Sequence, residues 1–375
     1  MERADRAHPR GAPWRAVLSA RLDAPATYAA GDPHGFGELL RGFADQVAEA
    51  ARVAEGLRLP DAPPGAVIVA GMGGAAIAGD FLQTLCHDRA PFPVQVVRGY
   101  GLPAWVGPDS LVVVSSYSGN TEETLAAYAA ARARGARLLA VTAGGELGAH
   151  ARREGLPCMR LPGGLPPRGA LAYLLIPLLV LLDRVGGGLG GAEEREEAVA
   201  LLKAFGAELA PEAPLARNPA KELAAWFEGR VPVVYGTELT APVAYRWRTQ
   251  LEENAKVVAL SGALPEIDHN AIEAWAATPG GPWAMLFLRD GAEHPRVARR
   301  LAATRAIAEG RVPTREARAR GTGRLARLLS LAHLGDWVSY YLALLRGVDP
   351  WTVATLEGFK QRMAEEDAAG ECQKP

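Results

Sequence analysis

Short apolar runs rich in β-branched residues recur through the first half of this chain and constrain its fold more than any other feature. They are AVIVA at 66–70, FPVQVVR at 92–98, LVVVSS at 111–116 and RLLAVT at 137–142. Runs of this length and composition are typical of strands buried on both faces of a parallel sheet. Helical patterns follow the first and third runs, and strands that alternate with helices predict a doubly wound α/β domain.

The same order of elements begins again in the second half. VPVVYG at 231–236 precedes a long helical segment, and PWAMLFLRD at 282–290 precedes another. Glycines stand at corresponding places in the two halves, Gly71 with Gly236 and Gly119 with Gly291. A repeated order of elements predicts a duplicated α/β domain, and two unrelated α/β domains are the alternative.

A glycine-rich and then acidic stretch, DRVGGGLGGAEEREE at 183–197, is the best candidate for a linker. We therefore predict a helical N-terminal lead-in at 1–62, a first doubly wound parallel-sheet domain at 63–190 and a second at 191–375. The length of 375 residues is sufficient for two domains.

Composition excludes several classes of protein. The net charge of −1 gives no overall field that would recruit nucleic acid or an anionic membrane. Three widely spaced cysteines form neither a disulfide framework nor a zinc motif, which favours a reducing cytoplasm. The longest apolar run, at 170–182, is too short to span a bilayer and predicts a buried helix. The first twenty residues lack the apolar core of a signal peptide, so we expect a soluble cytoplasmic protein.

The first motif with chemical meaning is GMGGAAIAGD at 71–80, between a strand and a helix. Gly71, Gly73 and Ala76 satisfy the dinucleotide pattern G-x-G-x-x-G/A, and such glycines let backbone N–H groups approach a phosphate. The second strand ends in Arg98 rather than in the acid that a nicotinamide site uses, so only an NADP site stays open. Tight packing of helix on strand would demand similar glycines and is the structural alternative.

The second motif is SSYSGNTEET at 115–124, again between a strand and a helix. Its five hydroxyls surround one glycine at a helix N-terminus, where O–H and N–H donors and the helix dipole favour a dianion. No lysine follows as in a nucleotide P-loop, so a monophosphate is the better ligand. An ordinary Ser/Thr N-cap is the alternative, but it explains only one or two of the hydroxyls.

Five motifs together make the sequence recognisable: GMGG at 71–74, SYSGNTEET at 116–124, PPRGALAY at 166–173, EENAK at 252–256 and DHN at 268–270. In this order they resemble the bifunctional phosphoglucose/phosphomannose isomerases of the sugar isomerase (SIS) domain superfamily. The resemblance runs from about residue 66 to the end. It implies two SIS domains, a homodimer, no metal, no cofactor, and interconversion of a hexose 6-phosphate aldose with fructose 6-phosphate.

The resemblance also implies roles for individual residues. Ser116, Ser118 and Thr121 would hold the substrate phosphate, aided by the backbone of Gly73 and Gly74. The residues at the reacting carbons would be Arg168 as a cation, Glu253 as the base, His269 for ring opening, across a dimer interface, and Lys360 as a further cation. Relatives usually carry serine where this chain has Ala75, so one expected hydroxyl is missing.

These residue types suit the chemistry. Moving a proton between C1 and C2 of an open-chain sugar needs one positioned base, and a cation must stand beside the developing enediolate. Histidine exchanges protons near neutrality, as ring opening requires. Each residue taken alone has a structural alternative: Glu253 and Lys360 as helix surface, His269 as a structural histidine, and Arg168 as a helix cap.

Two other functions compete with isomerisation. SIS domains also serve as non-catalytic sensors of sugar phosphates, but a sensor has no need for the pair of Glu253 and His269. An NADP-dependent reductase would leave the serine cluster unexplained. The arginine-rich segment 289–327 contains no aromatic residue, and we therefore interpret it as solvated helix surface rather than a nucleic-acid site.

Overall fold

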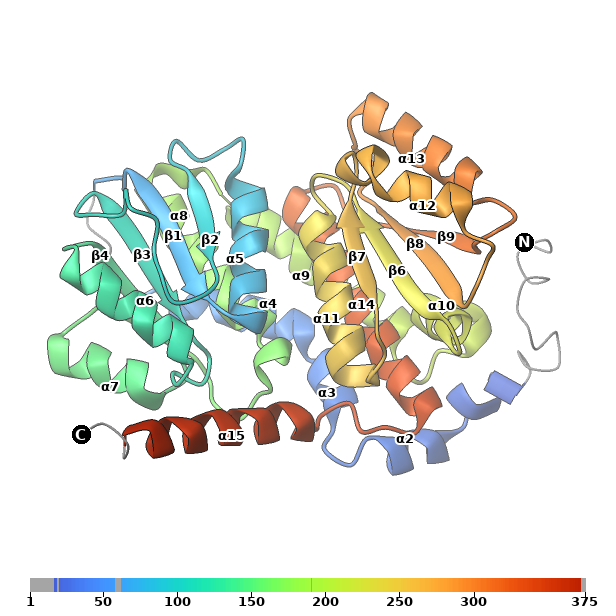
Figure 1. Ribbon diagram of the computed structural model, residues 1–375, viewed down its shortest axis with the longest axis horizontal. Coiled ribbons are helices and arrows are strands. Elements are labelled where there is room, and N and C mark those ends of the chain that lie inside the picture. The colour runs from blue at the N-terminus through green and yellow to red at the C-terminus, as the bar shows by residue number, and fades with distance from the viewer. Residues whose placement is uncertain (1–16, 19, 58–61, 190, 372–375) are drawn as a thin grey trace.

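The computed structural model describes residues 17–18, 20–57, 62–189 and 191–371. Two parallel sheets stand side by side, each covered by helices (Figure 1). The strands of the first sheet lie in the order β2-β1-β3-β4-β5. Their bounds are β1 Ala66–Gly71, β2 Val94–Val97, β3 Ser110–Ser115, β4 Arg137–Thr142 and β5 Cys158–Arg160.

Alternate residues of the central strands face two different helical layers. Val67, Val69 and Val113 belong to the main core, together with residues of α5 and α8. Ile68 and Val112 point the other way, into a cluster that α6 and α7 close. These helices are α5 Gly73–Cys86, α6 Glu122–Ala133, α7 Gly145–Glu154 and α8 Leu171–Leu182. Burial of β1 and β3 on both faces explains their continuous apolar sequence.

The second sheet repeats this arrangement with four parallel strands in the order β7-β6-β8-β9. The strands are β6 Val231–Gly236, β7 Leu260–Ala263, β8 Trp283–Arg289 and β9 Thr314–Arg318. Its helices are α10 Pro219–Phe227, α11 Ala241–Ala255, α12 Ala271–Ala277 and α13 Pro295–Ala308. The first strand of each half has its second and third strands on either side, so the expected duplicated, doubly wound fold is confirmed.

One helix joins the two halves. α14, Arg324–Arg346, packs against α11, α10 and α9 (Ala192–Leu209), and also touches α5. It is long and apolar enough to cross a membrane, but the apolar stretch is wholly buried, which is usual for a core helix. The expected buried helix at 170–182 is also confirmed, as α8.

The lead-in and the C-terminus complete the molecule. The lead-in forms α2 Pro25–Gly31, α3 Phe36–Arg41 and α4 Phe43–Val53, of which α4 packs on α8 and α9. The segment expected to be a linker continues α8 through one π-helical turn, Asp183–Gly187, and leads into α9. α15, Ala354–Glu371, runs beneath the first half of the molecule (Figure 1).

Candidate active site

The glycine-rich motif at 71–80 and the hydroxyl-rich motif at 115–124 meet at the carboxyl edge of the first sheet. β1 and β3 are neighbours, while their helices α5 and α6 depart to opposite faces, so this is the point where the winding of the sheet reverses. Open α/β sheets bind their ligands at such a point. A Cβ on Gly71 would lie 2.8 Å from the carbonyl oxygen of Ser115, which shows how closely the two loops approach.

The hydroxyl loop is folded by its own side chains. Ser116 Oγ lies 2.8 Å from Thr121 Oγ1 and accepts a hydrogen bond from the backbone N–H of Gly119. Gly119 has a φ of 74°, and a Cβ there would overlap the carbonyl oxygen of Gly144. Thr121 is the N-cap of α6, yet its side chain makes no capping hydrogen bond. The N-cap alternative therefore does not account for these hydroxyls, and Ser118 is exposed at the tip of the loop.

Arg168 packs against the glycine loop at the same edge of the first sheet. A Cβ on Gly74 would lie 2.8 Å from the carbonyl oxygen of Pro167 and 3.5 Å from Cα of Arg168. The N-terminus of α5 thus packs directly on the short 3₁₀ helix Pro167–Gly169. Ala75, where a serine was expected, is buried in the core behind this contact.

Arg168 is the centre of the site. Its side chain is 5% exposed, and its Nε donates to Asn254 Oδ1 at 2.6 Å. Its Nη2 donates to the carbonyl oxygens of Pro350 and Trp351 at 2.6 and 2.7 Å. Burial lowers the pKa of Arg168, and the carboxylate of Glu253 opposes this effect. A guanidinium stays protonated under such conditions, so Arg168 supplies a fixed positive charge.

Glu253 lies in the last turn of α11, with Oε2 3.6 Å from Arg168 Nη1. Its side chain is 35% exposed, so the carboxylate is accessible while it stays paired. A pocket of about 310 Å³ opens beside Arg168, between residues 164–168 and the segment that begins at Trp351. Two of the expected residues, from different halves of the chain, are thus paired, and one of them, Arg168, lines the pocket.

In the described part of one chain, His269 and Lys360 do not pair with these two residues, although Lys360 lies one helical turn after Glu357, which lines the pocket. Among the described residues, no hydrogen bond or ion pair joins either side chain to Arg168 or Glu253, and both residues are exposed. His269 follows β7 at the edge of the sheet where α11 begins, whereas Glu253 lies at the other end of α11. At 1.5 Å per residue, the two edges are roughly 18 Å apart along the helix.

Several residues around Arg168 were not foreseen from the sequence. The ring of Phe36, from the lead-in, lies 5.5 Å from the guanidinium carbon. Arg246 donates to the carbonyl oxygen of Arg168 at 2.9 Å, and Asp336 holds Arg246 through two hydrogen bonds. Lys256, the last residue of the EENAK motif, binds backbone carbonyls beside Glu253. Of the residues that contact Arg168 or Glu253, Asn254 and Lys256 belong to the EENAK motif, but the motif predicted no role for either of them.

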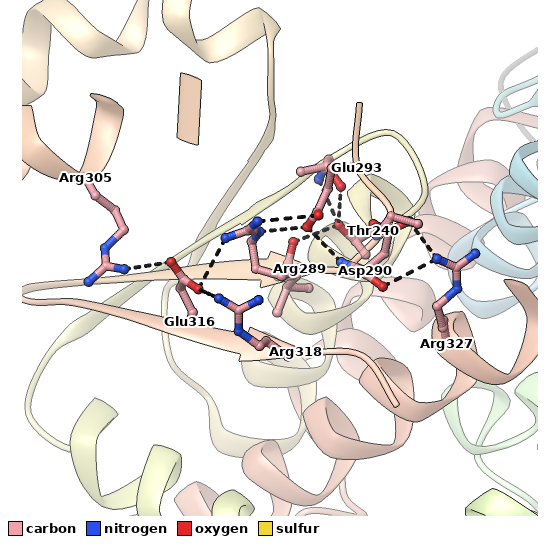
Figure 2. Close-up of polar contacts among 11 residues, drawn as sticks. Thr240, Arg289, Asp290, Glu293, Arg305, Glu316, Arg318 and Arg327 are labelled. Atoms are coloured by element: carbon pink, nitrogen blue, oxygen red, sulfur yellow. Dashed lines mark hydrogen bonds and ion pairs between the residues drawn. The ribbon is translucent and has the colours of Figure 1, made fainter. Parts of the chain in front are cut away.

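The corresponding edge of the second sheet is filled by side chains of its own (Figure 2). Thr240 Oγ1 donates to the carbonyl oxygen of Leu288, which closes the loop after β6 onto β8. Around the end of β8 lies a network of ion pairs: Arg289 with Glu293, Glu316 with Arg289, Arg305 and Arg318, and Asp290 with Arg327. Carboxylates would repel a phosphate here, so the described residues of this edge do not repeat the hydroxyl-rich arrangement found in the first sheet. The arginines of 289–327 are partly committed to these pairs rather than simply solvated.

The described residues offer little to a metal or a dinucleotide. No group of three or more His, Cys, Asp or Glu side chains within them could hold a metal ion. Arg98, which an NADP site would need for the 2′-phosphate, forms an ion pair with Asp80 and lies 5.6 Å from the ring of Tyr245. The charge of Arg98 is therefore already paired with Asp80 rather than left for a 2′-phosphate.

Comparison with known proteins identifies the family. A model of the family described as "Bacterial phospho-glucose isomerase C-terminal SIS domain" matches residues 216–363. The bifunctional phosphoglucose/phosphomannose isomerase of Caldicellulosiruptor bescii is 39% identical over 303 residues, which cover 80% of this chain and 89% of the relative. This chain belongs to the bifunctional phosphoglucose/phosphomannose isomerase family.

Further relatives support the assignment. The enzyme of the same name from Aquifex aeolicus is 38% identical, over 79% of this chain and 90% of the relative. A crystal structure of a glucose-6-phosphate isomerase like protein from Thermus thermophilus covers 88% of this chain and 98% of its own, with a TM-score of 0.60 and 25% identity. The family expected from the motifs is thereby confirmed.

Proposed function

We propose that this chain is a cofactor-free aldose–ketose isomerase that interconverts glucose 6-phosphate, mannose 6-phosphate or both with fructose 6-phosphate. The observation that carries the proposal is the pairing of Glu253 with Arg168, which lines a pocket and packs against the glycine loop at Gly74. Membership of the family supports the substrate class. The buried α14 fits a soluble enzyme of the cytoplasm, which is where we expect it to act.

The reaction needs four tasks from this chain. Ser116, Ser118, Thr121 and the backbone at Gly73 and Gly74 bind the phosphate of the substrate, where the N-termini of α5 and α6 add positive potential. In the open-chain aldose, Glu253 takes the proton from C2, and the electrons of that C–H bond form the enediolate as the C1 carbonyl becomes an oxyanion.

The second half of the reaction reverses this flow. Glu253 returns its proton to C1 while the C2 oxygen becomes the ketone carbonyl, so the carboxylate is regenerated and nothing else is consumed. Arg168 stabilises the negative charge of the intermediate because it is buried, always charged and already beside the base. The proton on oxygen moves from O2 to O1 in the same exchange, and Lys360 is proposed as a further cation near these oxygens.

Ring opening is assigned to His269 of a second copy in a homodimer. Glu253 and His269 of one chain occupy opposite edges of the second sheet, so one chain's histidine does not serve its own Glu253. A two-fold dimer can bring two such complementary parts together, because each interface residue is used twice.

A coupled spectrophotometric assay with each aldose 6-phosphate, with and without EDTA, tests the activity. Glu253→Gln keeps the size of the side chain but removes its basicity, so we expect turnover to fall by about 10²–10⁴-fold with inhibitor binding retained. Glu252→Gln is the matched control, because among the described residues Glu252 pairs with Arg248 alone, on the same helix, and its replacement should leave turnover within about twofold.

Mixing Glu253→Gln with His269→Ala protein tests the dimer. Subunit exchange should create heterodimers with one intact site and restore part of the activity. Full activity of Glu253→Gln would refute the proposed mechanism. Subunit exchange without any recovery of activity would refute the proposed role of a second copy.

A further inference from the structure

Four consecutive backbone carbonyls after α14 are held by two cations of the site. Lys256 Nζ donates to the carbonyl oxygens of Asp349 and Thr352, at 3.0 and 2.7 Å. Arg168 Nη2 donates to the two carbonyls between them, those of Pro350 and Trp351. The segment 349–352 is therefore bound by side chains that come from both halves of the chain.

Lys256 binds the other side of the site with the same ammonium group. Its Nζ also donates to the carbonyl oxygen of Glu253 at 2.7 Å, and it lies 3.4 Å from that of Asn254. Desolvation of the ammonium lowers the pKa of Lys256, and the nearby charge of Arg168 lowers it further. The lysine thus connects the last turn of α11, which carries Glu253, to the segment 349–352.

The backbone conformation at Lys256 indicates that the lysine side chain has a role of its own at this position. Lys256 caps α11 with φ 55° and ψ 43°, and it is the one non-glycine residue with positive φ in the described part of the chain. Glycine or asparagine occupies this position in helix caps at lower cost. A lysine that accepts the strained conformation must contribute something that those residues lack.

We infer that Lys256 is a positioning residue whose ammonium clamps the segment 349–352 onto the end of α11 and so builds one wall of the active-site pocket. The inference rests on the proposed function. Trp351 and Thr352 line the pocket opposite Pro166, Pro167 and Arg168, so the clamp sets the distance between the two walls. Once the ammonium is removed, two carbonyls lose their donor and the segment moves away from Arg168.

Release of the segment should affect the reaction more than substrate binding. Arg168 would lose the fixed positions of two acceptors, and its guanidinium would no longer be held beside Glu253. Small displacements of a catalytic group cost on the order of 10²-fold in rate. The loops proposed to bind phosphate lie at β1 and β3 and, in the part of the chain that the structure describes, share no hydrogen bond with Lys256, so KM should change little.

The test compares Lys256→Gly and Lys256→Asn with Lys203→Asn. Glycine and asparagine both accept the left-handed backbone, so a lysine that served only as a helix cap would be replaced without loss. Lys203 forms an exposed ion pair with Asp45 on distant helices and is the matched control. We expect kcat to fall by at least about tenfold in both Lys256 variants, with KM within about threefold and no change in Lys203→Asn.

Hydrogen exchange measured by mass spectrometry gives a readout independent of activity. Amides of residues 349–357 should exchange at least about tenfold faster in the Lys256 variants, while those of α6 should not change. Unchanged exchange in 349–357, or kcat within twofold of the unaltered protein, would overturn the clamp. An unaltered protein without isomerase activity would instead refute the proposed function, and the exchange experiment would still decide on the clamp.

Discussion

Replacement of Asp336 by asparagine should be among the most damaging single changes in this protein that do not touch substrate. Arg246 and Asp336 are 1% and 3% exposed. Both oxygens of Asp336 are acceptors: Oδ1 receives Arg246 Nε at 3.1 Å and Gln250 Nε2 at 2.7 Å, and Oδ2 receives Arg246 Nη2 at 2.7 Å. An amide places an NH₂ group where one oxygen was, so a donor must face a donor in either orientation.

The magnitude follows from this arrangement. The substitution leaves the buried guanidinium of Arg246 without its counter-charge, and breaking a buried pair in this way costs about 3–5 kcal/mol. Removing both charges, in Arg246→Met with Asp336→Leu, should cost less than the single change, because no buried charge is then left unpaired. Activity should still fall in the double variant, because Arg246 also donates to the carbonyl oxygen of Arg168.

Denaturant unfolding of the unaltered protein, Arg246→Met, Asp336→Leu and the double variant forms a double-mutant cycle, and Asp336→Asn is measured beside it. We expect a coupling free energy of at least about 2 kcal/mol between the two positions, and reduced kcat in every variant that lacks Arg246. A cost below about 1 kcal/mol for Asp336→Asn, or strictly additive effects, would refute the reasoning.

Two further predictions concern the phosphate and a buried histidine. Replacing both Ser118 and Thr121 by alanine should raise KM for hexose 6-phosphates far more than it lowers kcat, because the dianion is bound alike in ground and transition states; an unchanged KM would place the phosphate elsewhere. His333 is completely buried and accepts from Trp337 Nε1, and burial lowers its pKa to about 3. In the unfolded chain this histidine is protonated below about pH 6.5, whereas in the folded protein it stays neutral down to about pH 3. Its contribution to the free energy of unfolding is therefore fully present above pH 6.5 and is lost as the pH falls from 6.5 toward 3. Between pH 7 and 5 this one group should cost about 2 kcal/mol of unfolding free energy, measured by denaturation at each pH. His333→Gln, which can still accept from Trp337, should lack that component, and an identical pH dependence in both proteins would contradict the assignment.

The strands that were predicted are the central strands of both sheets and β2, an edge strand that keeps a run of β-branched residues. β1, β3, β6 and β8 are continuous apolar runs because helices cover each side, and this pattern is visible without knowledge of the partners. The edge strands β5, β7 and β9 were not predicted. They are three to five residues long and partly exposed, and TREAR at 314–318 has no apolar pattern at all.

The site divides in the same way. The hydroxyl loop and the glycine loop are local, so their place between strand and helix could be predicted from the sequence, and the resemblance added Arg168 and Glu253. The contribution of Phe36 could not be predicted, because it depends on how the lead-in folds back over the site. Lys256 belongs to the EENAK motif, but its role could not be predicted. Its four acceptors are backbone carbonyls on two separate segments, and any residue type supplies a backbone carbonyl.

The packing of α14 against the lead-in determines when this protein can finish folding on the ribosome. α2 and α3 rest on α14, and Tyr340 donates to Asp32 across that contact. Their partner is made some 280 residues later, which at about 5–20 residues per second is roughly 15–60 s of synthesis. The segment 349–352 that Arg168 and Lys256 bind is made later still. A nascent chain therefore carries an exposed N-terminal apolar surface until α14 is made, and the pocket beside Arg168 can form only after that.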